Sequence, residues 1–115
     1  MSADCIFCRI ISGEVPGDLV YTDEEMIAFR DINPVAPTHI LLVPREHIAS
    51  VQDLRPGQEN LMGRIIFRAR ELAEQEGIAS RGYRLVVNCG PEGGQVVPHL
   101  HVHLIGGRRL NDKMG

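Results

Sequence analysis

The stretch HLHVHLI, residues 99–105, alternates histidine with apolar residues and ends in two apolar residues. Successive side chains of a β-strand point to opposite faces of the sheet. We therefore expect His99, His101 and His103 on one face and the apolar residues between them on the core face. Sheet stability does not require imidazole. Three of the chain's five histidines at this spacing therefore indicate a chemical site.

Outward from this stretch, the sequence alternates between two hydrophobic periods. Residues 56–76 carry the apolar stripe of an amphipathic helix, and the N-terminal CIFCRIIS suggests a short helix. Four further segments are expected to be strands: Leu19–Thr22, Met26–Asp31, Thr38–Pro44 and Tyr83–Asn88. The predicted fold is α+β, a five-stranded, mainly antiparallel sheet with one long and one or two short helices on one face.

The composition limits the classes of function. The 115 residues suit a single domain, and 43% hydrophobic with 23% charged residues is typical of a globular chain. A net charge of −3 gives no basic field, so nucleic acid is not expected as a partner. No apolar run is long enough to span a membrane, and the N-terminus lacks a basic signal-peptide region. We expect a cytoplasmic protein whose three cysteines form no structural disulfides.

The histidine spacing has a geometric consequence for chemistry. Strand residues four apart are separated by about 13 Å, so the outer two histidines cannot readily converge on one ion. At least one histidine is free for other work. The glycine-containing loop NCGPEGGQ (88–95) leads into the histidines, and such loops let backbone N–H groups approach an anion. A neutral imidazole can attack phosphorus if its second nitrogen keeps its proton on a fixed acceptor.

Four segments carry a resemblance to a known family. HLHVHLI (99–105) matches the histidine-triad motif, and CIFCRIISGEVP (5–16), AFRDINPVAPTHILLVPREHI (28–48) and GYRLVVNCGPEGGQ (82–95) resemble the segments before it. The chain resembles the histidine-triad (HIT) superfamily, in particular its Hint-like branch. The resemblance implies a HIT-like fold over residues 1–115. It also implies hydrolysis of the P–N bond of purine nucleoside phosphoramidates through a covalent nucleotidyl-histidine.

The same resemblance implies roles for individual residues. His101 matches the nucleophile and His103 a phosphate contact, and His39 supports them from a neighbouring strand. Together with the first triad histidine, the implied catalytic set is His39, His99, His101 and His103. The implied nucleotide-binding set is Asp31 for the ribose, Phe7, Phe29 and Ile32 around the base, and Asn88, Gly94, Gln95, Val96, His101 and His103 on the phosphate side. Val96 departs from the family, because this position is often polar and can hydrogen-bond near the leaving group.

Cys5-x-x-Cys8 is half of a zinc site by spacing, and a redox pair or two buried thiols are the alternatives. The resemblance implies a structural Zn²⁺ held by these cysteines with His47 and His99, which would leave His101 and His103 for chemistry. No catalytic metal is expected. The third cysteine, Cys89, is expected to be a small buried apolar residue.

Two partners follow from the resemblance: a purine nucleotide, and a second copy of the chain joined through the strand at Gly82–Asn88 to continue the sheet. Two other functions stay open at this point. One is hydrolysis of dinucleoside polyphosphates, and the other is a nucleotide-sensing or interaction module with little turnover. A metal-dependent hydrolase is the weakest interpretation of the triad.

Overall fold

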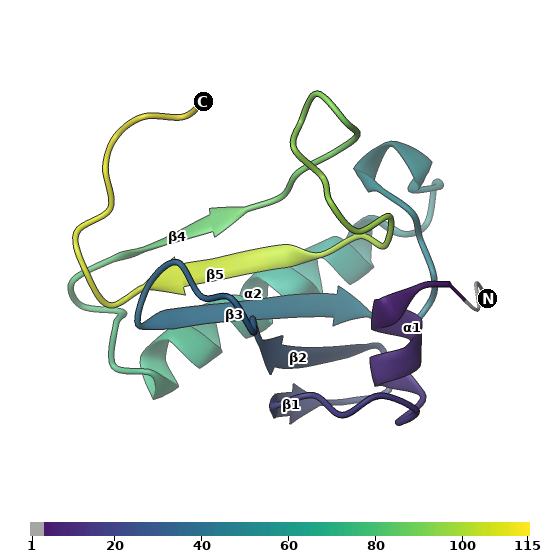
Figure 1. Cartoon of the computed structure of the whole chain (residues 1–115), viewed down its shortest axis with the longest axis horizontal. Helices are drawn as coiled ribbons and strands as arrows, with labels where there is room; N and C mark the ends of the chain where they lie inside the picture. Colours follow the sequence, from purple (N-terminus) through teal and green to yellow (C-terminus); the bar gives the residue numbers. More distant parts are fainter. Residues whose placement is uncertain (1–3) are drawn as a thin grey trace.

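The computed structural model describes residues 4–115, which form one antiparallel sheet and its covering helices (Figure 1). The elements in chain order are α1 (Ile6–Ile11), β1 (Leu19–Thr22), β2 (Met26–Arg30), β3 (Thr38–Pro44), the 3₁₀ turn η1 (Val51–Asp53), α2 (Glu59–Gln75), β4 (Tyr83–Val86) and β5 (Val102–Gly106). The strand order is β1-β2-β3-β5-β4, and all neighbours are antiparallel. The predicted α+β fold with five strands and one long helix is confirmed.

The central strand β3 is buried along its whole length, which fits the uninterrupted apolar run ILLV at its centre. Alternate residues of β2 and β3 supply two separate cores. Ile40 and Leu42 pack with the buried face of α2, whereas Leu41 and Val43 pack with Phe7 of α1. The sheet is therefore covered on both faces.

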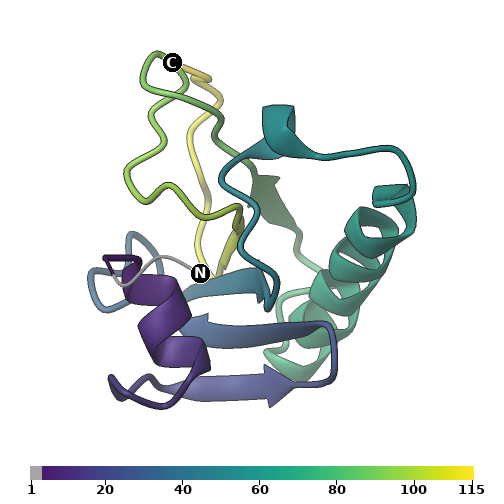
Figure 2. The same cartoon turned by 90° about the vertical axis from the view of Figure 1, so that its right-hand side faces the viewer.

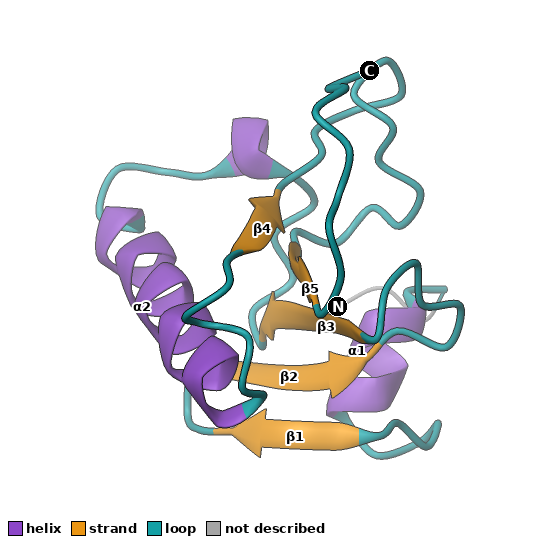
Figure 3. Ribbon diagram, turned by 90° about the vertical axis from the view of Figure 1, so that its left-hand side faces the viewer, coloured by secondary structure: helices purple, strands orange, loops and turns teal. Residues whose placement is uncertain are grey.

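The two helices lie on opposite faces of the sheet, as the side views show (Figures 2 and 3). The expectation that the helices share one face is wrong. The sequence of β2 gives the reason: MIAFR has apolar residues on both faces of the strand, and Ile27 and Phe29 need cover as much as Met26 and Ala28. A strand with two apolar faces requires a layer on each side.

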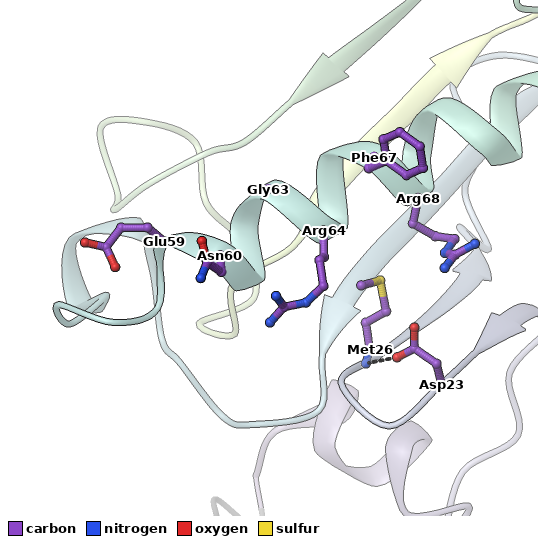
Figure 4. Close-up of a pocket in the computed structure, with 8 residues that line it drawn as sticks. All are labelled: Asp23, Met26, Glu59, Asn60, Gly63, Arg64, Phe67 and Arg68. Atoms are coloured by element: carbon purple, nitrogen blue, oxygen red, sulfur yellow. Dashed lines mark hydrogen bonds between the residues drawn. The ribbon is translucent and has the colours of Figure 1, made fainter.

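Helix α2 is fixed to the β1–β2 turn by polar contacts around a shallow hollow (Figure 4). Asp23 accepts hydrogen bonds from the N–H groups of Glu25 and Met26. Arg64 pairs with Glu25, and the Arg68 guanidinium lies 4.2 Å from the centre of the Tyr21 ring. These charged side chains already have partners within the protein, so the contacts around the hollow serve to attach helix α2 to the sheet.

Several element boundaries differ from the predictions. Helix α2 begins at Glu59 instead of Pro56, because Gly57 adopts a left-handed φ of +98° that no helix includes. Strand β5 begins at Val102, and the Leu100 N–H donates to the Ile48 carbonyl instead of joining the sheet ladder. Only His103 of the triad therefore lies within the strand. Among residues 4–115, no helix is long and apolar enough to cross a membrane.

Candidate active site and metal centre

A cavity of about 500 Å³ opens on the α1 face of the sheet. Its volume lies in the usual range for small-molecule sites. Phe7 from α1, Phe29 from β2 and Leu41 from β3 supply apolar lining, and five polar side chains also line the cavity. These polar residues are Asp31, His39, Asn88, His101 and His103.

Most of the predicted nucleotide-binding residues line this cavity, namely Phe7, Phe29, Asp31, Ile32, Asn88, Gly94, Val96, His101 and His103. Gln95 does not line it. Its side-chain NH₂ donates to the carbonyls of Ala49 and Val97, and its side-chain oxygen accepts the Gly90 N–H. Gln95 therefore fixes the shape of the glycine loop. Of the predicted catalytic set, His99 is fully buried and does not line the cavity.

His101 has a defined tautomer. Its Nδ1 lies 2.7 Å from the carbonyl oxygen of His99, which can only accept a hydrogen bond. Nδ1 therefore carries the proton, and Nε2 keeps its lone pair. The ring of Phe7 packs edge-on against His101, with centroids 5.1 Å apart, and restricts its rotation. This is the proton arrangement that a histidine nucleophile requires.

A chain of hydrogen bonds fixes two more histidines. The Val35 N–H donates to His39 Nδ1 at 3.2 Å, so the proton of a neutral His39 is on Nε2. That Nε2 lies 2.9 Å from His103 Nδ1 and donates to it. The proton of His103 is consequently on its own Nε2, where it serves as a donor.

Burial keeps these histidines uncharged. Burial, together with smaller effects of the neighbouring His101 and His39, lowers the pKa of His103 from its ordinary 6.5 to about 4, and Asp31 opposes this shift. Burial also lowers the pKa of His39, although the nearby Asp31 opposes this shift. At neutral pH both are neutral imidazoles with one N–H donor each, so the tautomer chain persists.

The depressed pKa of His103 predicts a loss of stability in acid. Between pH 6.5 and about 4 the unfolded chain binds a proton at His103 that the folded chain does not. The free energy of unfolding should therefore fall as the pH falls through this window. Urea denaturation from pH 7 to 4 checks this, with His103→Gln as the control. The His103→Gln curve should fall less steeply, and parallel curves would contradict the assignment.

Four metal-ligating side chains converge at the N-terminal end of the molecule: Cys5, Cys8, His47 and His99. Their ligand atoms all lie within 4.8 Å of one another. His99 Nδ1 is 3.2 Å from Cys5 Sγ, and His47 Nδ1 is 3.3 Å from Cys8 Sγ. A tetrahedral zinc with ordinary bond lengths separates its sulfur and nitrogen ligands by about 3.5 Å. The spacing fits zinc.

Proton positions at His99 also suit a metal. His99 Nε2 lies 2.8 Å from the Pro44 carbonyl oxygen and donates to it, so Nδ1 presents its lone pair to the two sulfurs. A ligating histidine usually anchors its other ring nitrogen in this way. The site is therefore pre-arranged for a thiophilic ion with two sulfur and two nitrogen ligands.

A second cluster, Asp31, His39 and His103, also meets the spacing for a metal. The positions of the protons on its two histidines disfavour metal binding. The Val35 N–H occupies His39 Nδ1, so a metal on His39 Nε2 would require an imidazolate or a broken hydrogen bond. The tautomer chain favours proton donation at this cluster and metal binding at the first.

The remaining cysteine lies elsewhere than expected. Cys89 is exposed and not buried, because strand β4 ends at Val86 and the glycine loop carries Cys89 out to solvent. Cys5, Cys8 and Cys89 form no disulfide bond.

Known proteins similar to this chain identify its family. The model of the HIT domain family matches residues 12–110. The chain belongs to the HIT family. This HIT protein is 51% identical over 110 residues to the purine nucleoside phosphoramidase of Escherichia coli K12, covering 96% of this chain and 92% of that protein.

Two solved structures support the assignment. A HIT family hydrolase from Legionella pneumophila superposes with a TM-score of 0.95 at 46% identity, covering 97% of this chain and all of that one. A zinc-bound histidine triad family protein from Mycobacterium smegmatis superposes with a TM-score of 0.78 at 30% identity, covering 97% of this chain and 80% of that one. The fold of this HIT protein is thus that of its family.

Sequence reasoning missed Val35. It lines the cavity and, through its backbone N–H, sets the tautomer of His39. A backbone donor has no side-chain signature, so no residue pattern could have indicated this role. The only available signal was its place between two prolines in NPVAP, which marks an unusual turn.

Proposed function

We propose that this HIT protein hydrolyses the P–N bond of adenosine and guanosine 5′-phosphoramidates through a covalent nucleotidyl-histidine. The observation that carries the proposal is His101. Its Nε2 lone pair lies at a nucleotide-sized cavity, and its Nδ1 proton is held by the His99 carbonyl. The 51% identity to a purine nucleoside phosphoramidase supports the substrate class.

The first step forms a P–N bond and breaks another. His101 Nε2 attacks the α-phosphorus, the leaving nitrogen departs with the bonding electron pair, and it takes up a proton to become the free amine. His103 donates its Nε2–H to a phosphate oxygen, which stabilises charge in the transition state. The Val96 side chain has no donor for the leaving group, so in this proposal a solvent water supplies that proton and becomes hydroxide, which the proton released in the second step neutralises.

The second step releases the nucleotide. Water attacks the phosphorus and gives up one proton to the solvent, the bond to His101 breaks, and the ring nitrogen regains its lone pair while the nucleoside monophosphate leaves. The Nδ1–H of His101 stays hydrogen-bonded to the His99 carbonyl during both steps. His101 acts as both nucleophile and leaving group, and neither step requires a catalytic metal.

The cavity walls suit the rest of the nucleotide. In this proposal the Asp31 carboxylate accepts hydrogen bonds from the ribose hydroxyls, and Phe7, Phe29 and Ile32 contact the base. Ile32 and Val96 are 92% and 89% exposed. Ligand binding would cover these two apolar side chains at the cavity rim.

The test is release of AMP from adenosine 5′-phosphoramidate by the purified protein, in parallel with a diadenosine polyphosphate. Faster turnover of the phosphoramidate supports the proposal. Preference for the dinucleotide would favour the polyphosphate hydrolase, and tight AMP binding without turnover of either would favour a nucleotide sensor. A chelator should leave the initial rate on folded protein unchanged.

We also propose that Cys5, Cys8, His47 and His99 hold a structural zinc ion. Two thiolates and two imidazoles are a common ligand set for closed zinc sites, which leave no position for substrate. Three of the four residues are buried, and the cluster is separate from the cavity. The ion would join α1 to the segments after β3 and before β5.

We propose a homodimer that continues the sheet through β4. This strand is an edge strand with half-buried side chains, and its outer backbone groups have no sheet partner among the described residues. Val87, just beyond it, is 37% exposed. Antiparallel pairing of two copies across a two-fold axis would satisfy that edge.

A charged residue at this edge should prevent association. Val87→Arg is expected to weaken dimerisation at least about 100-fold, because it would bury an unpaired charge. Val51 on η1, 38% exposed, offers a matched control. Sedimentation velocity should show a dimer for the wild type and Val51→Arg and a monomer for Val87→Arg. A wild-type monomer would refute the dimer.

Three further expectations remain proposals. We propose that residues 1–115 form a single HIT domain, which the one continuous sheet supports. The cytoplasmic location stays a prediction from the sequence, as does the lack of a nucleic-acid partner.

A further inference from the structure

The C-terminal segment after β5 contacts the loop that sets the histidine tautomers. Arg108 Nη2 donates to the Val35 carbonyl at 2.9 Å, although the two residues are 73 positions apart. Gly107 packs against the same loop: a Cβ added there would lie 2.9 Å from Pro37 Cβ. Gly107 also has a φ of +97°, which turns the chain toward the loop.

Val35 links this contact to the cavity. Its carbonyl is held by Arg108, and its N–H donates to His39 Nδ1. His39 in turn donates from Nε2 to His103 Nδ1. Arg108, Val35, His39 and His103, each from a different segment, thus form one chain of contacts that ends at a histidine of the cavity.

Few other interactions hold Val35 in place. The residue is 56% exposed and follows Pro34, which has no N–H to anchor the turn. Asp31 accepts the Asn33 N–H and so shapes the start of the loop, but that contact does not reach Val35. The other terminal nitrogen of Arg108 donates to the Arg109 carbonyl, which orients the guanidinium.

We propose that Arg108 is a positioning residue for the reaction, acting through Val35 to keep His39 and His103 in the tautomers that present a donor to the phosphate. This inference rests on the proposed function for its kinetic consequence. Its structural consequence, the proton positions on His39 and His103, does not depend on any activity.

Without Arg108, the Val35 N–H is free to move from His39 Nδ1. His39 can then place its proton on either nitrogen, and with the proton on Nδ1 it no longer donates to His103. A fraction of molecules would therefore lack the His103 donor. Nucleotide affinity should change little, since Arg108 does not line the cavity.

The experiment compares Arg108→Ala and Arg108→Lys with Arg109→Ala, which removes a neighbouring exposed charge without the bond to Val35. We expect kcat for adenosine 5′-phosphoramidate to fall about three- to tenfold in Arg108→Ala, with KM nearly unchanged. Arg108→Lys, which retains a charged donor, should recover part of the loss. Arg109→Ala should behave like the wild type.

Nitrogen-15 NMR of the histidine rings provides the second readout, because the shifts distinguish protonated from unprotonated ring nitrogens. The wild type should show His39 and His103 protonated at Nε2, and Arg108→Ala should show a mixture at His39. Unchanged tautomers in Arg108→Ala, or an equal fall of kcat in Arg109→Ala, would overturn the inference. Absence of turnover in the wild type would refute the proposed function while leaving the NMR test of Arg108 intact.

Discussion

Replacing His101 with alanine should lower phosphoramidate turnover by at least about 10⁴-fold, because it removes the nucleophile and with it the covalent route. His101 is 6% exposed, and its Nδ1 already contacts the His99 carbonyl. Neither His39 nor His103 can substitute, since both direct their Nδ1 atoms into the tautomer chain. The measurement is AMP release from adenosine 5′-phosphoramidate.

Three further measurements separate chemistry from binding. His101→Ala should still bind AMP, because the apolar lining and Asp31 remain, and calorimetry measures this. Turnover by His103→Gln should fall by about 10- to 100-fold, because His103 supplies a hydrogen bond to the phosphate and does not form the bond to phosphorus. Rapid quenching of the wild type should trap protein carrying one nucleotidyl group, and His101→Ala should trap none. Full activity in His101→Ala would eliminate the proposed mechanism.

Disruption of the zinc centre should cause the largest loss of stability. A ligand present at 100 to 1,000 times its dissociation constant stabilises the folded state by about 2.7–4.1 kcal/mol. For a chain of this size, removal should lower Tm by about 10–20 °C. Cys5→Ser, or a chelator added to the wild type, should produce this change in differential scanning calorimetry.

Cys89→Ser is the matched control, because it removes the exposed thiol and leaves the cluster intact. Its Tm should equal that of the wild type, and a chelator should lower both equally. The chelator should have little further effect on Cys5→Ser. If the chelator leaves the wild-type Tm unchanged and the protein contains no zinc by elemental analysis, Cys5 and Cys8 are two buried thiols and the proposed centre is wrong.

Much of the fold could be predicted from local patterns. The strand Thr38–Pro44 was predicted with its observed bounds, since a continuous apolar run flanked by turn signals depends on few distant contacts. The long helix was predicted apart from its first turn, where Gly57 stops it. The covering of both sheet faces was not predicted, because the side on which α1 packs depends on tertiary contacts of Phe7 with Phe29 and Leu41.

The sequence by itself determined which chemical groups this protein has and, by the alternation of HLHVHLI, that the histidines lie opposite the core residues Val102 and Leu104. It also determined that His99 is too far along the chain to share one ion with His103. These are properties of residue type and spacing, which short-range geometry transmits directly. Both expectations hold in the structure, although only His103 of the three histidines lies within β5.

Only the tertiary structure decided where each proton resides. His99 donates to the Pro44 carbonyl, His101 donates to the His99 carbonyl, and His39 accepts from the Val35 N–H. Pro44 is 55 residues from His99 in the sequence, and His99 and Val35 lie outside the regular strands. Imidazole has two equivalent positions for one proton, so its chemistry is set by the hydrogen-bond partner that folding supplies. Backbone groups supply those partners: two are carbonyls, which every residue has, and one is an N–H, which only proline lacks. The sequence therefore determines which histidines are present, and the tertiary structure determines which nitrogen of each one carries the proton.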